Sequence, residues 1–124
     1  MTTPTARSYD DFQTFRAELN EKILARGTTV TKRFFTLDTK TYEAGALDVR
    51  TKELLGLVAS MVLRCDDCIA YHIDQCVEAG VGDEELFEAF DIALIVGGSI
   101  VIPHLRRAVA FVDECRSQRP GDER

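Results

Sequence analysis

The spacing of the apolar residues constrains the fold most, because they recur every three or four positions along nearly the whole chain. Phe12, Phe15 and Leu19 open the first series, which Ser8 caps and Gly27 ends. No segment shows the strand alternation or the hairpin signals of a β-sheet. The 124-residue sequence therefore predicts one all-α domain of about six helices, covering residues 1–124.

Cap residues and glycines predict where the later helices begin and end. The expected helices cover 30–44, 49–63 after Asp48, 66–79 before Gly80, a stretch that Asp83 caps, and 100–116. Phe34, Phe35 and Leu37 are the expected anchors of the second helix. The uncharged run 92–102 should be buried on all sides, either in the core or against another subunit. The core would span about 12–115, with a polar tail at 117–124.

Charge and hydropathy exclude several classes of partner. The net charge of −6 argues against nucleic acid and against an anionic membrane surface, since both need a basic face. Residues 1–7 lack the apolar region of a signal peptide, and the uncharged stretch 92–103 is too short to cross a bilayer. We therefore expect a cytoplasmic protein, in which a Cys-x-x-Cys pair is more often catalytic or metal-binding than a structural disulfide.

The most informative motif is the Cys-x-x-Cys pair of Cys65 and Cys68, which His72 follows four residues later. On a helix these three side chains share one face. The helix N-terminus, Arg64 and His72 all favour a thiolate there, whereas the two aspartates between the cysteines oppose it. The pattern predicts a redox pair that closes a disulfide within one helical turn.

Metal binding is the main alternative for these residues. Cys65, Cys68, His72 and Cys76 could supply four zinc ligands, but the first and last lie about 16 Å apart along one helix and cannot converge. A three-ligand site that includes His104 or Glu53 remains open. Haem attachment of the c type needs a histidine directly after the second cysteine, where this sequence has Ile69. We therefore expect no haem, and we expect no other cofactor.

Glu53 lies on an unusual side of the third helix. The expected apolar face of that helix carries Leu54, Leu55, Val58, Met61 and Val62. Gly56 and Ser60 share the other side with Glu53, and such small residues let a second element approach the carboxylate. Glu53 is then either partly buried, which suits proton transfer, or an ordinary exposed residue.

Simpler interpretations apply to several other residues. Cys76 and Cys115 are expected to be small buried hydrophobic residues, and His104 a structural histidine that could approach the site. The acids Asp67, Asp74 and Glu78 are expected to form a solvated helix face.

Two stretches of the sequence, nine residues apart, resemble a known family. Residues 45–55 followed by 65–72 are similar to the carboxymuconolactone decarboxylase superfamily, on its alkylhydroperoxidase D-like (AhpD-like) branch. The downstream Glu78-Ala79-Gly80 and Gly97-Gly98 also match its pattern, and the similarity covers about 12–115. The resemblance implies an all-helical protein that assembles as homo-oligomers, either trimers or hexamers.

The resemblance also implies a thiol-dependent peroxidase or disulfide reductase. Cys68 would attack the hydroperoxide or disulfide substrate, Cys65 would resolve it, and Glu53 with His72 would relay the proton. An external dithiol would then reduce the disulfide. Asp67 departs from the family, because members with this activity often carry a histidine there. A muconolactone decarboxylase, which needs no thiol pair, and a redox-sensing oligomer without enzyme activity are the alternatives.

Overall fold

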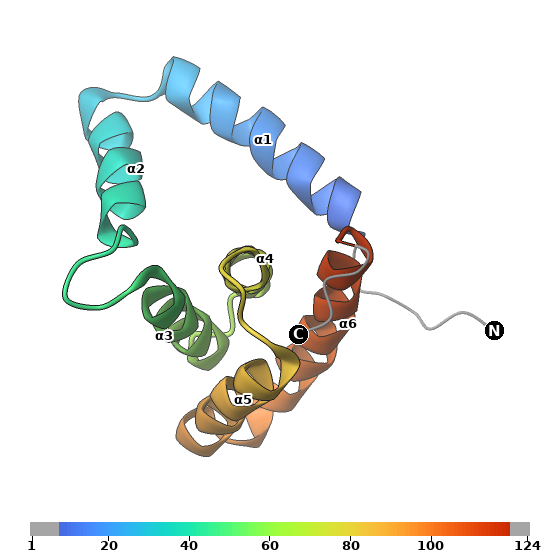
Figure 1. Cartoon of the computed structure of the whole chain (residues 1–124). Coiled ribbons are helices and arrows are strands. Elements are labelled where there is room, and N and C mark those ends of the chain that lie inside the picture. Colours follow the sequence, from blue (N-terminus) through green and yellow to red (C-terminus); the bar gives the residue numbers. More distant parts are fainter. Residues whose placement is uncertain (1–7, 120–124) are drawn as a thin grey trace.

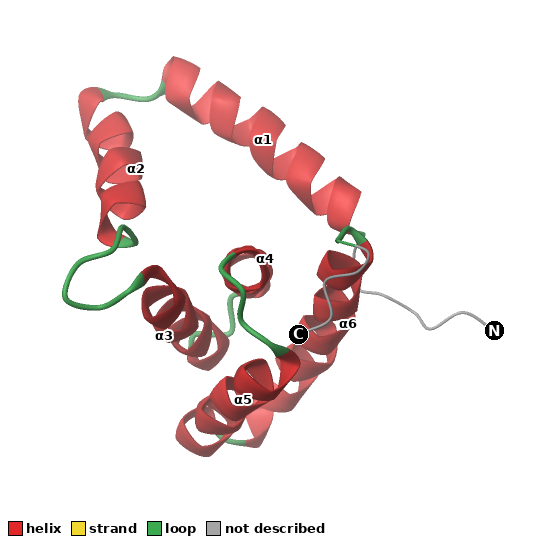
Figure 2. Cartoon of the chain, viewed as in Figure 1, coloured by secondary structure: helices red, strands yellow, loops and turns green. Residues whose placement is uncertain are grey.

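Six α-helices and one short 3-10 helix make up residues 8–119, the part of the chain that this computed structural model describes. They are α1 (Tyr9–Arg26), α2 (Thr29–Thr41), α3 (Val49–Val62), α4 (Asp66–Glu78), α5 (Asp83–Gly97), η1 (Ser99–Val101) and α6 (Ile102–Ser117). Between residues 8 and 119 there is no strand, so the predicted all-α fold of about six helices is confirmed (Figure 2). Residues 1–7 and 120–124, on which the leader and tail predictions depend, lie outside the described residues.

Helix α4 occupies the centre of the fold, packed between α3 and α6, and α5 also packs against α3 (Figure 1). The core is a single cluster of apolar side chains, most of them from these helices, which Phe12 of α1 and Val101 of η1 join. Its largest fully buried members are Phe90, Leu57, Met61, Ile73 and Leu86. Helices α1 and α2 form an arc beside this core, and α2 buries no residue within the chain. The fold therefore rests on α3 to α6, which carry every candidate site residue.

The reversal between α3 and α4 positions the Cys-x-x-Cys motif. Arg64 adopts the left-handed conformation, with φ of 60°. The N–H of Arg64 donates to the carbonyl of Met61 and the N–H of Cys65 donates to that of Ser60, both at 3.0 Å. These two bonds are the Schellman pattern, normally built on a glycine. The turn ends α3 and leaves Cys65 as the N-cap of α4.

The second helix ends three residues earlier than predicted, at Thr41. The Nζ of Lys52, on α3, donates to the carbonyls of Thr41 (2.9 Å) and Glu43 (2.7 Å). A cation bound to the last carbonyls of a helix stabilises its C-terminus and ends it there. Two of the three predicted anchors of this helix were also wrong, because Phe34 and Leu37 are exposed, whereas Phe35 is partly buried.

The most buried side of α3 is shifted from the predicted apolar face, of which only Met61 is fully buried. Glu53, Leu57, Ser60 and Met61 are buried, while Leu55 is exposed and Leu54 and Val58 are only partly covered. Helix α4 packs against the side that carries the small residues, and this contact sets the orientation of α3. The alternative of an exposed Glu53 is therefore wrong.

Two acidic residues also differ from their predicted roles. Asp74 was expected on a solvated face, but it is buried and accepts hydrogen bonds from Gln13 (3.0 Å) and Arg119 (3.3 Å). Asp83 is the first residue of α5 rather than its cap, because Gly82 holds the cap position. The buried Asp74 ties α4 to both α1 and the end of α6.

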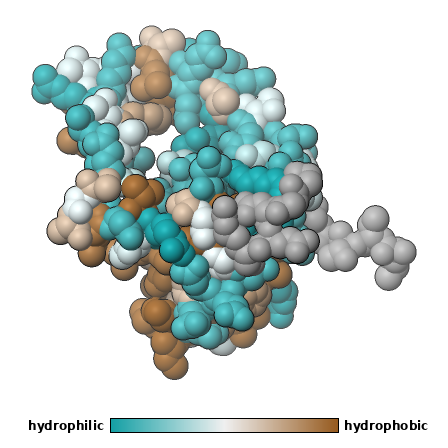
Figure 3. Space-filling view, in the orientation of Figure 1, coloured by the Kyte–Doolittle hydropathy of each residue, from teal (hydrophilic) through white to brown (hydrophobic). Residues whose placement is uncertain are grey.

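The apolar run 92–102 is not buried on all sides within the chain. Gly98, with φ of 82°, ends α5, η1 follows, and α6 begins at Ile102 rather than at residue 100. Ile95 is 83% exposed, and Ile92, Val96 and Ile100 are also exposed. Figure 3 shows hydrophobic side chains gathered at the lower end of the molecule, where Figure 1 places α5. The prediction that these residues are buried in the core is wrong, while their contact with another subunit stays a prediction.

No helix within residues 8–119 has both the length and the apolar composition that crossing a bilayer requires.

Candidate active site

Cys65 and Cys68 are joined by a disulfide at the N-terminus of α4, with their Cα atoms 5.3 Å apart. The backbone N–H of Cys68 donates to the Sγ of Cys65 at 3.2 Å. Cys65 is half-buried and Cys68 is exposed, so a substrate in solvent can reach the pair. The structure thus presents the oxidised form of the predicted redox pair, at the positive end of a helix.

A buried carboxylate–imidazole pair lies one turn further along α4. The Nδ1 of His72 is 2.8 Å from the Oε1 of Glu53, and the two residues are 8% and 3% exposed. An ionised carboxylate can only accept, so in this bond Nδ1 carries the proton and Nε2 is left as the basic nitrogen. Two helices, α3 and α4, supply the pair, and their close packing excludes water from it.

Two tyrosines surround the imidazole. The hydroxyl of Tyr42 is 3.4 Å from the Nε2 of His72, and the rings of both Tyr42 and Tyr71 have centroids 5.2 Å from the imidazole. Burial raises the pKa of each tyrosine, and the negative charge of Glu53 raises it further. Both phenols therefore keep their protons at neutral pH, and Tyr42 can donate its O–H to Nε2.

Gly56 leaves room for this arrangement on α3. A Cβ at this position would lie 2.6 Å from the Cε1 of His72 and 2.8 Å from the hydroxyl of Tyr42. Real Cβ atoms do not approach that closely, so a larger residue here displaces the imidazole or the phenol.

We expect Gly56→Ala to move the His72 ring while the helices stay intact. Overpacking costs about 1–3 kcal/mol, and alanine returns up to about 1 kcal/mol through its helix propensity. Imidazole ¹⁵N resonances report the change directly, since the chain has only two histidines. Gly45→Ala is the matched control, because a Cβ there meets nothing closer than the Lys52 Nζ at 3.7 Å. Unchanged His72 signals in Gly56→Ala would contradict the expected displacement.

The aspartate that follows Cys65 is held by α6. Asp66 accepts from the Nδ1 of His104 at 2.8 Å and from the Nε of Arg107 at 2.9 Å. The Nη2 of Arg107 lies 3.2 Å from the same His104 nitrogen. His104 therefore approaches the site, as the sequence allowed, through a direct contact with the Cys-x-x-Cys motif.

The other two cysteines are buried free thiols, as expected. Burial raises the pKa of each thiol to about 12, with added repulsion from Glu53 on Cys76 and from Asp74 on Cys115. At neutral pH both stay protonated, and they are unreactive.

The metal alternative finds no support in the described residues. Between residues 8 and 119, no group of three or more His, Cys, Asp or Glu side chains is arranged to hold a metal ion. Glu53 and His104, the two candidate third ligands, instead bind His72 and Asp66.

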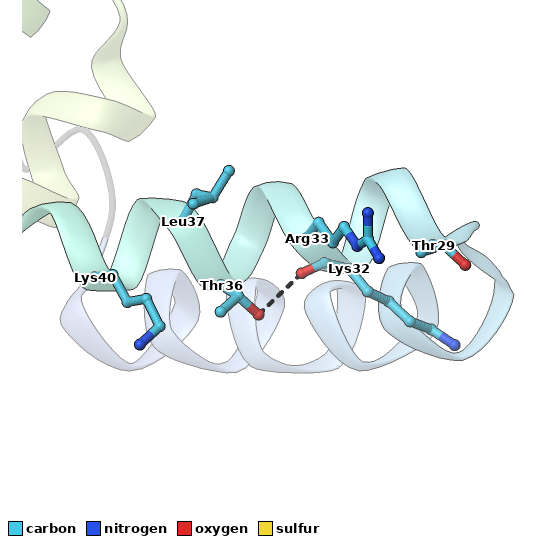
Figure 4. Close-up of a pocket in the computed structure, with 6 residues that line it drawn as sticks. All are labelled: Thr29, Lys32, Arg33, Thr36, Leu37 and Lys40. Atoms are coloured by element: carbon cyan, nitrogen blue, oxygen red, sulfur yellow. Dashed lines mark hydrogen bonds between the residues drawn. The ribbon is translucent and has the colours of Figure 1, made fainter.

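A shallow hollow along α2 lies apart from this chemistry (Figure 4). Its lining comes from that helix alone: Thr29, Lys32, Arg33, Thr36, Leu37 and Lys40. Thr36 donates its hydroxyl to the Lys32 carbonyl at 3.1 Å, so even its polar groups are partly occupied by the helix. No cysteine, histidine or carboxylate lines it, and we do not assign it a role.

The structure joins the predicted site residues in two pairs, Glu53 with His72 and Cys65 with Cys68. Within residues 8–119, no hydrogen bond links His72 to either sulfur, although Cys68 lies one helical turn before it. Sequence reasoning missed Tyr42, which no local pattern marks. It also missed Arg107, although its place one turn after His104 gave a usable signal.

Together these features define an all-helical protein with a solvent-accessible Cys-x-x-Cys disulfide beside a buried glutamate–histidine pair. A profile of the carboxymuconolactone decarboxylase family matches residues 28–111. The chain belongs to this family, and the resemblance drawn from the sequence is confirmed.

Solved structures agree with this assignment. Protein TM1620 from Thermotoga maritima is 66% identical, with a TM-score of 0.86 over 89% of this chain and 96% of that chain. A second structure of TM1620 carries the description of a carboxymuconolactone decarboxylase family protein with a suggested part in an antioxidative response. The family member lpg0406 from Legionella pneumophila is 26% identical, with a TM-score of 0.65 over 87% of this chain and 90% of its own.

A curated relative is more distant. Uncharacterized protein 4 in the cox locus of Paracoccus denitrificans is 30% identical over 88 residues, which are 71% of this chain and 79% of that protein.

Proposed function

We propose that this protein is a thiol-dependent oxidoreductase that reduces organic hydroperoxides through Cys68 and Cys65. The observation that carries the proposal is the buried Glu53–His72 pair, one helical turn beyond an exposed cysteine of a disulfide. A thiolate needs a nearby base to form, which His72 would supply, and a positive environment to persist. The N-terminus of α4 supplies the positive environment. The antioxidative response suggested for TM1620 is consistent with this chemistry.

In the proposed reaction, His72 takes the proton of the reduced Cys68 thiol, and Glu53 balances the charge of the imidazolium. The thiolate attacks the distal oxygen of the hydroperoxide, the O–O bond breaks, and the alcohol leaves with a proton from the imidazolium. Cys68 is now a sulfenic acid. The Cys65 thiol attacks its sulfur, and water and the disulfide form. An external dithiol returns two electrons and two protons.

A partner disulfide is the alternative substrate for the same pair, because a thiolate also attacks disulfide sulfur. We further propose that the protein acts in the cytoplasm as a trimer or hexamer. The exposed apolar residues of α5, which would lie between subunits, support this assembly. The thiol pair argues against the decarboxylase activity that names the family, since that chemistry uses acid–base groups alone.

A thiol count on the native protein tests the proposal. After reduction, two thiols should react with iodoacetamide at pH 8. Cys76 and Cys115 should react only after unfolding, since burial and a pKa of about 12 protect them. One equivalent of an organic hydroperoxide should remove both accessible thiols together, and dithiothreitol should restore them. An unchanged count after hydroperoxide would refute the peroxidase proposal, and a lactone-decarboxylation assay would then be the next measurement.

A further inference from the structure

The acidic residue beside the disulfide and the basic residues that bind it come from different helices. Asp66 directly follows Cys65 in the first turn of α4, where its negative charge lies close to any thiolate of the pair. Both groups that bind its carboxylate, the His104 imidazole and the Arg107 guanidinium, come from α6. Within residues 8–119, Arg107 is the only arginine or lysine that forms an ion pair with Asp66, and His104 adds a hydrogen bond. The contact therefore joins the Cys-x-x-Cys turn to a helix that carries neither cysteine.

We propose that His104 and Arg107 are positioning residues that set the dithiol–disulfide equilibrium of Cys65 and Cys68 by offsetting the charge of Asp66, Arg107 through its guanidinium and His104 through a hydrogen bond. This inference rests on the proposed function in one respect, that the pair cycles between its two redox forms. Neither α6 residue touches a sulfur in the described contacts; both act through the carboxylate of Asp66.

The direction follows from the charge of each redox form. The disulfide is neutral, whereas the reduced pair carries thiolate character. A negative charge nearby destabilises the reduced form, and a positive charge stabilises it and makes the pair more oxidising. An unneutralised Asp66 would therefore favour the disulfide. With Arg107 and His104 bound to it, the reduced form becomes more accessible to an external dithiol.

Equilibration with dithiothreitol measures this balance. Reduced dithiothreitol and the protein disulfide exchange two electrons and two protons, giving oxidised dithiothreitol and the Cys65–Cys68 dithiol. Arg107→Gln should shift the equilibrium constant toward the protein disulfide by about two- to fivefold, the scale of partly exposed ion pairs. Asp66→Asn should shift it toward the dithiol by a similar factor. His104→Gln should move it in the same direction as Arg107→Gln.

Two further variants separate charge from structural damage. Asp66→Asn combined with Arg107→Gln should lie between the two single variants, because the removed charges cancel. Arg106→Gln, one residue earlier on α6 and exposed, is the matched control and should equal wild type. Raising the salt concentration should shrink every shift, since mobile ions screen partly exposed charges.

The outcomes are distinguishable. If the pair equilibrates but Arg107→Gln and Asp66→Asn match Arg106→Gln, or shift in the same direction, the tuning role is refuted while the proposed function stands. A disulfide that dithiothreitol cannot reduce and re-form overturns both proposals. Circular dichroism on each variant shows that the helices are retained.

Discussion

Cys68→Ser is expected to abolish hydroperoxide turnover, whereas Cys65→Ser is expected to keep the first chemical step and lose the second. Cys68 is the more exposed residue of the pair, and it precedes His72 by one helical turn. A serine hydroxyl in its place stays protonated at neutral pH and does not attack peroxide oxygen. Loss of the nucleophile should lower turnover by at least about a hundredfold.

Cys65→Ser gives the matched comparison, because it removes the same atom three residues away. Without a resolving thiol, Cys68 should accumulate as sulfenic acid after one equivalent of hydroperoxide. Mass spectrometry should then show the gain of a single oxygen on the peptide that contains Cys68. Full turnover in Cys68→Ser, or oxygen gained on Cys65 in that variant, would show that the attacking cysteine is misassigned.

Local signals accounted for most of the fold. Ser8 caps α1, with its Oγ accepting from the Asp11 N–H at 3.0 Å, and Gly27 ends it, as predicted. The errors arose where a group distant in the sequence determines the local structure. Lys52 binds the carbonyls that end α2, and no pattern within α2 reports a cation on α3. Arg64 takes a left-handed conformation that sequence rules assign to glycine.

The site was predictable in its members but not in its geometry. Cysteine and histidine spacing along one helix fixes which face they share, so Cys65, Cys68 and His72 could be named together. The small residues around Glu53 indicated a close helix contact, and His72 is what fills it. The apolar residues of α3 nevertheless predicted a face that includes the exposed Leu55 and leaves out the buried Glu53 and Leu57. A buried carboxylate–imidazole hydrogen bond and a glycine can outweigh Leu55, which remains exposed, when the neighbouring helix supplies the complementary group.

Asp66 shows a further limit of the sequence. From the motif alone, both of its aspartates oppose thiolate formation. In the structure, Asp66 is bound by His104 and Arg107 of α6, some forty residues later in the chain. Asp67 is exposed on the helix surface. This contact depends on how α4 packs against α6, and the spacing of residues within one helix does not predict that packing.

Glu53→Gln is expected to slow turnover and to shift its pH dependence, without changing the helical content. Glutamine matches the shape of the buried side chain and can still accept from the Nδ1 of His72. It cannot balance the charge of an imidazolium, however, and solvent is nearly absent there. His72 then becomes a weaker proton acceptor for Cys68, and thiolate formation needs a higher pH. The loss should be on the order of ten- to a hundredfold near neutral pH.

The rising limb of the pH–rate profile of Glu53→Gln should therefore move to higher pH, and part of the activity should return in alkaline buffer, where Cys68 loses its proton without help. A purely structural role for Glu53 predicts a loss that is the same at every pH. Glu88→Gln, an exposed carboxylate on α5, is the control and should match wild type in rate and profile. If Glu53→Gln matches that control, the proton does not pass through His72 and Glu53, and Cys68 must be activated by the helix N-terminus and its neighbouring charges alone.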